Sequence, residues 1–356
     1  MDFHIFEKQD LWTRLKNDTR PIILYGMGNG ADKIIRVLTH IGREVSDFFA
    51  SDEFVRGQLF WGKRVMRLDE IEEKYEDFVI LIAFASSLPS VMNKMAELCR
   101  RHEVYIPDVS VVDDEKVFDL EFVHTHRESI SAAYRALCDD ESRRVFDALL
   151  NFKLSGKMHY LLDSFSEKED AYLNILSPQE YRTVLDLGAY NGDSVREVAL
   201  YAPKLELAVA AEPDGKNYKK LCDYAAREER FRVIPLALGA YSHPAEMSVG
   251  IGLGRGSAIG KGNKCVLLQM DAPDNMISGK VDFIKYDVEG AESAALLGSR
   301  MLIEKYRPEL LVSLYHRNED LFSLILQVSR LLPEYKLYLR KHPSVPAWDI
   351  NLYCVI

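Results

Sequence analysis

Residues Val184–Ser194 read VLDLGAYNGDS and carry the clearest structural signal in this 356-residue chain. A short apolar run that contains one acid, Asp186, leads into a turn with two glycines and then into a helix. Asp193 or Ser194 is expected to cap that helix. Glycine lets a ligand approach the backbone, and the N-terminus of the helix is electropositive. The stretch therefore predicts a buried strand followed by a ligand-binding turn, as in an α/β fold.

The glycine spacing distinguishes this turn from a dinucleotide site. A dinucleotide fingerprint reads G-x-G-x-x-G, and its pyrophosphate sits on the helix N-terminus. Here Gly188 and Gly192 are spaced G-x-x-x-G, and Asp186 stands at the end of the strand. An aspartate aimed at the turn disfavours a pyrophosphate and favours the ammonium of an amino-acid moiety. S-adenosylmethionine has such an ammonium and is the predicted ligand.

A second acid supports a nucleoside-containing ligand. The next predicted strand ends in AAEPD (210–214), so Glu212 comes 24 residues after Gly188 (212 − 188). An acid at the end of the second strand, about 20 residues after the glycine turn, can accept hydrogen bonds from both ribose hydroxyls. Asp214 is expected to cap the following helix, and the alternative is that Glu212-Pro213-Asp214 is only such a cap.

The stretch Val281–Glu292, VDFIKYDVEGAE, places three acids at the carboxyl end of another predicted strand. Ligand sites of α/β sheets lie at that end of the strands. Glu289 and Glu292 have an alternative role as acids that favour the helix dipole. Asp287 stands at the strand tip, where its side chain would face the crevice.

Strand-like and helix-like segments alternate through the C-terminal half. The predicted strands are 183–187, 207–211, 232–236, 281–286 and 309–315. Two further strand-like segments, 335–341 and 348–356, are separated by HPSVPA, which is too short for a helix, so they must run antiparallel. Five parallel strands closed by an antiparallel hairpin are the Rossmann-like, doubly wound sheet of class I methyltransferases.

The motifs DLGAYNGDS, AAEPD, FIKYDVEGAE and PELLVSLYH occur in this order between Asp186 and His316. In order and spacing they resemble the FkbM-type S-adenosylmethionine-dependent methyltransferases, over roughly residues 130–356. The D-x-E-G-x-E pattern after an apolar strand is the hallmark of that family, and Tyr190-Asn191 is one departure from it. The resemblance implies methyl transfer to oxygen, commonly a hydroxyl of a sugar, a polysaccharide precursor or a secondary metabolite.

The motifs and the resemblance together assign roles to single residues. The resemblance implies donor-binding roles for Asp186, Gly188 and Glu212, and it places Asp287 and Glu289 beside the reacting centre. The full predicted donor site consists of Asp186, Gly188, Ala189, Tyr190, Asn191, Gly192, Asp193, Ser194, Glu212, Pro213 and Asp287.

His316 follows the strand 309–315 and is the predicted general base, with Asp287 and Glu289 as its catalytic partners. Its ordinary pKa of about 6.5 suits proton transfer near neutral pH, and a nearby Asp287 carboxylate would raise that pKa modestly. The alternative is a divalent ion held by Asp287, Glu289 and His316. Oxygen-rich ligation favours magnesium or calcium, which one imidazole fits poorly, so the metal route ranks second.

The segment 250–262, GIGLGRGSAIGKG, contains six glycines and cannot form a stable helix or central strand. One interpretation is a mobile lid over the acceptor, in which Arg255, Ser257 or Lys261 contacts a polar substrate. The alternative is a hairpin connection without a ligand.

The N-terminal segment also alternates between strands and helices and predicts a smaller Rossmann-like module of perhaps four strands. Gly26, Gly28 and Ala31 satisfy G-x-G-x-x-A between a strand and a helix, and Asp52 follows the second strand. A nucleotide or nucleotide-sugar site is one interpretation, and a structural or substrate-presenting role is the other. We expect no tight NAD binding, because the short module lacks a second mononucleotide half.

Composition narrows the protein class. Net charge is −10 without a basic block, which excludes a nonspecific nucleic-acid binder. No run of about 18 apolar residues predicts a membrane span, and the N-terminus lacks a signal-peptide pattern. Five widely spaced cysteines indicate reduced thiols, so the expected location is the cytoplasm. A homodimer is compatible with the sequence.

The predicted organisation is an N-terminal Rossmann-like accessory domain (1–120), a helical connector (121–180) and a methyltransferase domain (181–356). The hypothesis is a cytoplasmic S-adenosylmethionine-dependent O-methyltransferase that acts on a small-molecule or glycan hydroxyl. One alternative is an NAD-dependent oxidoreductase that uses the N-terminal glycine turn. A non-catalytic nucleotide-sensing protein is the other.

Overall fold

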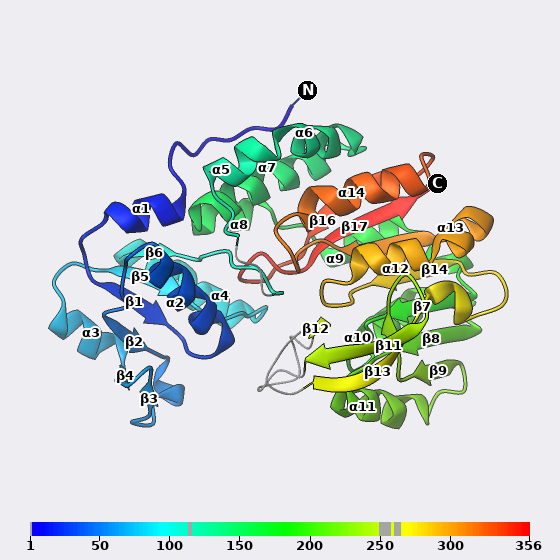
Figure 1. Ribbon diagram of the computed structural model, residues 1–356, viewed down its shortest axis with the longest axis horizontal. Helices are drawn as coiled ribbons and strands as arrows, with labels where there is room; N and C mark the ends of the chain where they lie inside the picture. Colours follow the sequence, from blue (N-terminus) through cyan, green and yellow to red (C-terminus); the bar gives the residue numbers. More distant parts are fainter. Residues whose placement is uncertain (1, 113–115, 249–257, 260–264) are drawn as a thin grey trace.

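The computed structural model describes residues 2–112, 116–248, 258–259 and 265–356, and these residues form three β-sheets (Figure 1). The N-terminal sheet (blue to cyan) and the C-terminal sheet (green to red) lie on opposite sides of the molecule. A group of helices from the middle of the chain lies between them along one side. None of the described helices is both long and apolar enough to cross a membrane.

The C-terminal sheet has seven strands and confirms the predicted fold class. In sheet order they are β16 (Lys336–Lys341), β17 (Ile350–Val355), β15 (Glu309–Ser313), β14 (Phe283–Tyr286), β7 (Thr183–Leu187), β8 (Leu207–Ala211) and β9 (Phe231–Ile234). The strands from β15 to β9 are parallel, β17 is antiparallel to β15, and β16 is antiparallel to β17. This is the predicted doubly wound sheet with an antiparallel C-terminal hairpin.

Helices cover this sheet between its strands. They are α10 (Asp193–Tyr201), α11 (Gly215–Ala225), α12 (Glu292–Gly298), α13 (Arg300–Tyr306) and α14 (Asp320–Leu331). The Asp214 cap of α11 is confirmed, because its carboxylate accepts from the backbone N–H groups of Lys216 and Asn217. The predicted cap of α10 is wrong: Gly192 is the cap, in the left-handed conformation, and Asp193 and Ser194 already lie inside the helix.

A second, four-stranded sheet is inserted before β14, and the sequence did not predict it. Its order is β10 (Ala237–Leu238), β13 (Cys265–Asp271), β11 (His243–Ser248) and β12 (Ala258–Ile259). β11 and β13 form an antiparallel pair. The predicted substrate residues Arg255, Ser257 and Lys261 lie outside the described residues.

The N-terminal sheet has six strands among the described residues, two more than the sequence suggested. Its order is β3 (Leu59–Phe60), β4 (Lys63–Met66), β2 (Asp47–Phe49), β1 (Ile22–Tyr25), β5 (Val79–Ile82) and β6 (Glu103–Tyr105). All neighbours are parallel except β3, which is antiparallel to β4. Charged residues in β4 and β6 hid these short strands from the apolar pattern. The helices of this part are α1 (Leu11–Asn17), α2 (Asn29–His40), α3 (Leu68–Lys74) and α4 (Pro89–Arg101).

Between the two sheets the chain is helical, as predicted. The helices are α5 (Leu120–Thr125), α6 (Arg127–Ala136), α7 (Asp140–Ser155) and α8 (Met158–Asp163). Residues 166–170, predicted as a loop, instead lead into α9 (Lys168–Asp170) and a π-helix at Ala171–Ile175. One hydrophobic cluster includes Ile80 of β5, Phe146 of α7 and Ile284 of β14. Because this core crosses residues 120 and 180, we keep the three domain boundaries as a proposal.

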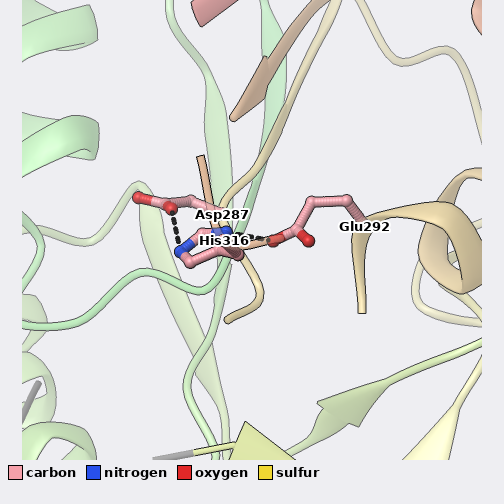
Figure 2. A group of neighbouring side chains, drawn as sticks. All are labelled: Asp287, Glu292 and His316. Atoms are coloured by element: carbon pink, nitrogen blue, oxygen red, sulfur yellow. Dashed lines mark ion pairs between the residues drawn. The ribbon is translucent and has the colours of Figure 1, made fainter. Parts of the chain in front are cut away.

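The order of the strands sets the place of the site. Parallel neighbours β14 and β15 end at the same sheet edge, and the residues that follow them include Asp287 and His316. Figure 2 shows these two side chains facing each other, with Glu292 from the start of α12 on the other side of the imidazole. The topology therefore brings acids and a histidine together at the carboxyl edge.

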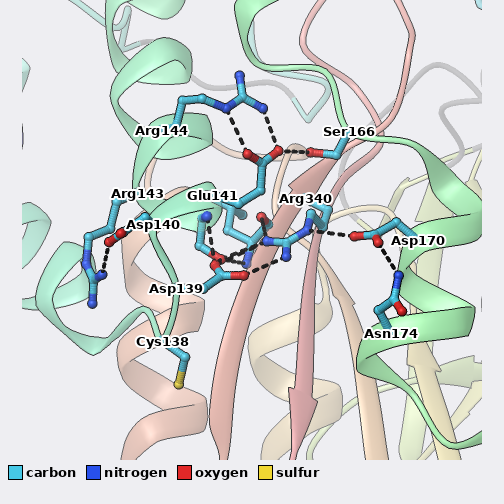
Figure 3. A network of polar contacts seen from close by, with 12 residues as sticks. Cys138, Asp139, Asp140, Glu141, Arg143, Arg144, Ser166, Asp170, Asn174 and Arg340 are labelled. Carbon is cyan, nitrogen blue, oxygen red and sulfur yellow. Dashed lines mark hydrogen bonds and ion pairs between the residues drawn. The ribbon is translucent and has the colours of Figure 1, made fainter.

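A buried arginine fastens the connector to the C-terminal hairpin (Figure 3). Arg340 of β16 is 4% exposed, and its guanidinium lies 2.6 Å from the carboxylate of Asp139, which caps α7. It also donates to the Ser142 hydroxyl at 2.9 Å. The same figure shows an exposed pair on α7, in which Arg144 contacts Glu141.

We expect Arg340→Met to lower the free energy of unfolding by about 2–3 kcal/mol. Breaking a buried pair costs about 3–5 kcal/mol, and the partial exposure of Asp139 reduces that cost. The matched control, Arg144→Met, breaks an exposed pair and should cost no more than about 1 kcal/mol. Urea unfolding of both variants measures the difference. Equal losses would show that the Arg340 network does not hold the connector.

Candidate active site

A cavity of about 780 Å³, here called the central cavity, lies between the N-terminal sheet and the carboxyl edge of the C-terminal sheet. Ligand pockets usually measure about 300–1,000 Å³. The N-terminal part of the chain contributes Met27, Asn29, Lys33, Ala83, Phe84 and Val111 to its wall, among others. The C-terminal part contributes Gly188, Glu212, Lys285, Asp287, His316 and Trp348, among others.

The turn after β7 forms one end of this cavity. Gly188 has φ of +86°, and a Cβ atom there would stand 1.8 Å from the backbone oxygen of Asp287. Any other residue would therefore push β7 and β14 apart at the sheet edge. The turn continues through Tyr190, which holds a left-handed conformation with φ of +50°. A non-glycine residue in that conformation is uncommon and is often found at functional turns.

Asp186 lies behind the cavity wall. The residue is 3% exposed. One carboxylate oxygen lies 3.5 Å from Nζ of Lys285, and the other has no hydrogen-bond partner within the described parts of the chain. Lys285 itself lines the cavity and lies 3.2 Å from the carboxylate of Asp287. Burial raises the pKa of Asp186, and the Lys285 ammonium opposes that rise.

Glu212 lies at the end of β8, faces the central cavity and is 6% exposed. One oxygen accepts from the backbone N–H of Tyr190 and the other from that of Asp214, both at 2.8 Å. Burial raises the pKa of Glu212 to about 7, although both hydrogen bonds oppose the rise. Each carboxylate oxygen has two lone pairs, so Glu212 keeps acceptor capacity for a ligand.

The other predicted donor-site residues divide into two groups. Besides Gly188 and Glu212, the cavity wall includes Tyr190, Asp193, Ser194, Pro213 and Asp287. Ala189, Asn191 and Gly192 stand behind it in the turn, as Asp186 does in the strand.

The acid–histidine cluster forms the other end of the site (Figure 2). Nε2 of His316 lies 3.5 Å from Asp287 and 3.6 Å from Glu289. Nδ1 lies 2.9 Å from Oε1 of Glu292. The hydroxyl of Tyr315 donates to Asp287 at 3.0 Å. The structure therefore brings together His316, Asp287 and Glu289, the three residues predicted to be catalytic, and adds Glu292 behind them.

These carboxylates change the protonation of His316. Burial alone would lower the pKa of the imidazole, but Glu292, Asp287 and Glu289 raise it to about 10. The sequence predicted only a modest rise, because it treated Glu292 as a possible helix-end acid. At neutral pH, His316 therefore holds its proton in the ligand-free chain.

The four predicted N-terminal site residues lie in different surroundings. Gly26 lies against the ring of Phe84, and Ala31 is buried in the core. Gly28 begins α2 beside the cavity-lining residues Met27 and Asn29. The Asp52 side chain is 79% exposed and pairs with Arg67 at 3.8 Å. A nucleotide site here stays a prediction.

Comparisons with known proteins identify the family of the C-terminal part. Residues 186–339 match the family model of the methyltransferase FkbM domain. These residues form an FkbM methyltransferase domain. No curated protein matches the chain in a sequence comparison.

Solved structures show how far the fold extends. Methyltransferase FkbM from Methylobacillus flagellatus KT aligns with a TM-score of 0.72 and 21% identity, over 96% of this chain and 92% of that chain. At this identity the similarity concerns the fold, and it includes the N-terminal part. A spermidine synthase structure reaches a TM-score of 0.31 with 13% identity, over 49% of this chain and 52% of its own, which is too low to support an argument.

The central cavity also contains residues that the sequence analysis missed. Lys285 pairs with both Asp186 and Asp287. The sequence feature that could have identified it is a lysine inside an apolar strand, two residues before Asp287. Tyr315 stacks on Trp348 with ring centres 6.4 Å apart. His342 lines the same cavity, where Nδ1 lies 3.1 Å from the Ser166 carbonyl and Nε2 lies 2.8 Å from the Tyr353 hydroxyl.

The pKa values of the two buried histidines beside the central cavity should be shifted in opposite directions. His316 has a pKa raised to about 10, while burial lowers the pKa of His342 to about 4. NMR of the imidazole Cε1–H signals between pH 5 and 9 should find His316 charged and His342 neutral throughout. His316→Gln and His342→Gln assign the signals. Titration of either group near its ordinary pKa of about 6.5 would contradict the charge arrangement described above.

Proposed function

We propose that this methyltransferase is S-adenosylmethionine-dependent and transfers the methyl group to a hydroxyl oxygen. The acceptor class is a sugar, a polysaccharide precursor or a secondary metabolite. The observation that carries the proposal is that the glycine turn with Glu212 and the acid–histidine cluster line one cavity. A donor at the first and an acceptor at the second would meet within it. A cytoplasmic location and a homodimer stay expectations.

The donor end of the cavity fits a cationic nucleoside. Glu212 retains acceptor capacity toward ribose hydroxyls, and Asp193 and Glu197 add carboxylates to the same wall. A cation is favoured beside such groups, and S-adenosylmethionine has an ammonium and a sulfonium. The turn at Gly188 leaves backbone atoms open to the cavity. We assign the donor to this end.

S-adenosylmethionine supplies an electrophilic methyl group on its sulfonium. The chain must orient the acceptor hydroxyl and take its proton as the oxygen–carbon bond forms. His316 can accept that proton only after it has lost its own, and Asp287 and Glu289 lie nearest to Nε2. We therefore propose that these three residues handle the proton as a unit, which typically contributes about 10²–10⁴-fold to a rate.

The acceptor end suits a ring with apolar and polar faces. Tyr315 and Trp348 present stacked aromatic rings beside Asp287. Aromatic surfaces bury apolar area, while the neighbouring carboxylates accept hydrogen bonds from hydroxyls. A sugar or a polyhydroxylated metabolite has both features.

The direct test incubates the full chain with S-adenosylmethionine that carries a labelled methyl group and with a panel of hydroxylated acceptors. Labelled product and an equal amount of S-adenosylhomocysteine should form. Activity toward amine or thiol acceptors without any toward hydroxyls would overturn O-methylation. No S-adenosylhomocysteine with any acceptor, together with no donor binding by calorimetry, would overturn the proposed cofactor.

We expect Glu212→Ala to weaken donor binding. Hydrogen bonds to a charged acceptor are worth about 1.5–3 kcal/mol, which corresponds to about 10- to 150-fold in affinity. Glu212→Gln keeps one acceptor oxygen and should fall between the variant and the natural chain. Glu206→Gln, which breaks an exposed pair with Arg182, is the matched control. Calorimetry that finds equal affinity in all four proteins would remove Glu212 from the donor site.

A further inference from the structure

Three side chains from two strand ends converge at one point on the wall of the central cavity. Asp287 and Glu289 follow β14, and His316 follows β15. Oxygen atoms of Asp287 and Glu289 lie 3.5 and 3.6 Å from Nε2 of His316. Neighbouring ligand atoms of an octahedral cation stand about 3 Å apart when metal–oxygen bonds are about 2.0–2.1 Å. Each carboxylate therefore lies about half an ångström farther from Nε2 than two ligands of one cation would.

A buried carboxylate holds the other side of the ring. Glu292 is 1% exposed, and its Oε1 lies 2.9 Å from Nδ1 of His316 without the alignment of a good hydrogen bond. The same oxygen accepts from the backbone N–H of Val288 at 2.8 Å and of Gly290 at 3.3 Å. Its second oxygen, Oε2, is buried without a hydrogen-bond partner within the described ranges. Glu292 thus holds the turn that carries Glu289 by hydrogen bonds, and it contacts the ring as an ion pair.

The backbone around the cluster is also fixed. Glu289 adopts a left-handed conformation with φ of +52°. At Gly290, with φ of +91°, an added Cβ would stand 2.5 Å from Val112. The backbone oxygen of His316 accepts from the Val112 N–H at 3.1 Å and the Ser110 hydroxyl at 3.0 Å. A strained non-glycine residue persists only where its surroundings hold it, as they do at many ligand sites.

We propose that Asp287, Glu289 and Nε2 of His316 bind a divalent cation, and that Glu292 is the positioning residue that orients the imidazole. Ligand atoms of Asp287, Glu292 and His316 also lie within 4.8 Å of one another, but Glu292 faces Nδ1, so we assign Glu292 to the ring and not to the ion. Figure 2 shows that Asp287 and Glu292 face opposite ring nitrogens, so an ion on Nε2 has Glu292 behind it. Metal-binding histidines almost always donate their other N–H to such a partner.

The mixed ligand set selects the class of ion. Carboxylates and water suit magnesium, calcium and manganese, whereas imidazole suits transition metals. Manganese(II) satisfies both preferences and is the ion to which we commit. The proposal rests on the proposed function and changes one step of it. A cation on Nε2 would take the place of the proton there and would lower the pKa of a hydroxyl bound beside it, so that this hydroxyl could lose its proton to water. It also changes the ranking made from sequence, because the sequence could not show Glu292 on the far side of the ring.

The test measures binding rather than activity. The full chain is stripped with EDTA and titrated with Mn²⁺ at pH 7.5 by calorimetry, with electron paramagnetic resonance to count free ions. We expect one site that Glu289→Gln and His316→Gln each weaken at least tenfold, and that Glu292→Gln weakens about 10- to 100-fold. Glu304→Gln, which breaks an exposed pair with Arg300, should leave the site unchanged.

Two outcomes would overturn the site: no bound Mn²⁺ at millimolar free ion, or equal binding by the natural chain, Glu289→Gln and His316→Gln. Thermal melts check that the variants are folded. If His316→Gln does not fold, the test relies on Glu289→Gln, because Glu289 is part-exposed and its substitution should not disturb folding. Donor affinity is measured on the same metal-free samples. If the donor binds and Mn²⁺ does not, the cation site is wrong and the proposed function still stands. If Mn²⁺ binds and the donor does not, the cation site stands and the proposed function is wrong.

Discussion

The close approach of β7 and β14 at Gly188 is the constraint on which the site depends. The strands are parallel neighbours, and only a glycine leaves room for the backbone oxygen of Asp287, which a Cβ atom would meet at 1.8 Å. This contact places the glycine turn directly beside the residues that follow β14. β8 is the next strand beside β7, and β15 is the next strand beside β14. Because parallel strands end at the same edge of the sheet, Glu212 after β8 and His316 after β15 line the same cavity.

Ion pairs stabilise the charged side chains that lie close together at this edge of the sheet. Lys285 lies between Asp186 and Asp287, and His316 lies among Asp287, Glu289 and Glu292. Burial alone would lower the pKa of Lys285, but the two carboxylates raise it. Burial likewise opposes the charged form of Asp287, yet Lys285 and His316 lower its pKa below the ordinary value. Lys285 and His316 thus favour the ionised form of Asp287, and a cation in place of the His316 proton would do the same.

The sequence predicted those strands and site residues that a local pattern of residues determines. The strands Thr183–Leu187 and Leu207–Ala211 lie where expected, because each is a continuous apolar run that ends at a turn. The hairpin β11–β13 was expected only as the alternative for the segment 250–262, and its strands were not predicted. The short strands β4 and β6 were missed, because pairing with neighbouring strands, not their own composition, makes them strands. In the site, strand ends identified Asp287, Glu212 and His316. The sequence could not show that Lys285 pairs with Asp186 or that Glu292 lies behind His316, because these contacts depend on three-dimensional distances and not on spacing along the chain.

The N-terminal part of the chain directly contacts the residues of the candidate active site. Ser110 and Val112 donate to the backbone oxygen of His316, and Val112 packs against Gly290 in the turn that carries Glu289. Met27, Asn29 and Phe84 complete the opposite wall of the central cavity. A methyltransferase sheet alone would leave that wall open and the His316 backbone without these two donors. The N-terminal part of the chain therefore closes the cavity, and the segment after β6 holds the backbone of His316 in place.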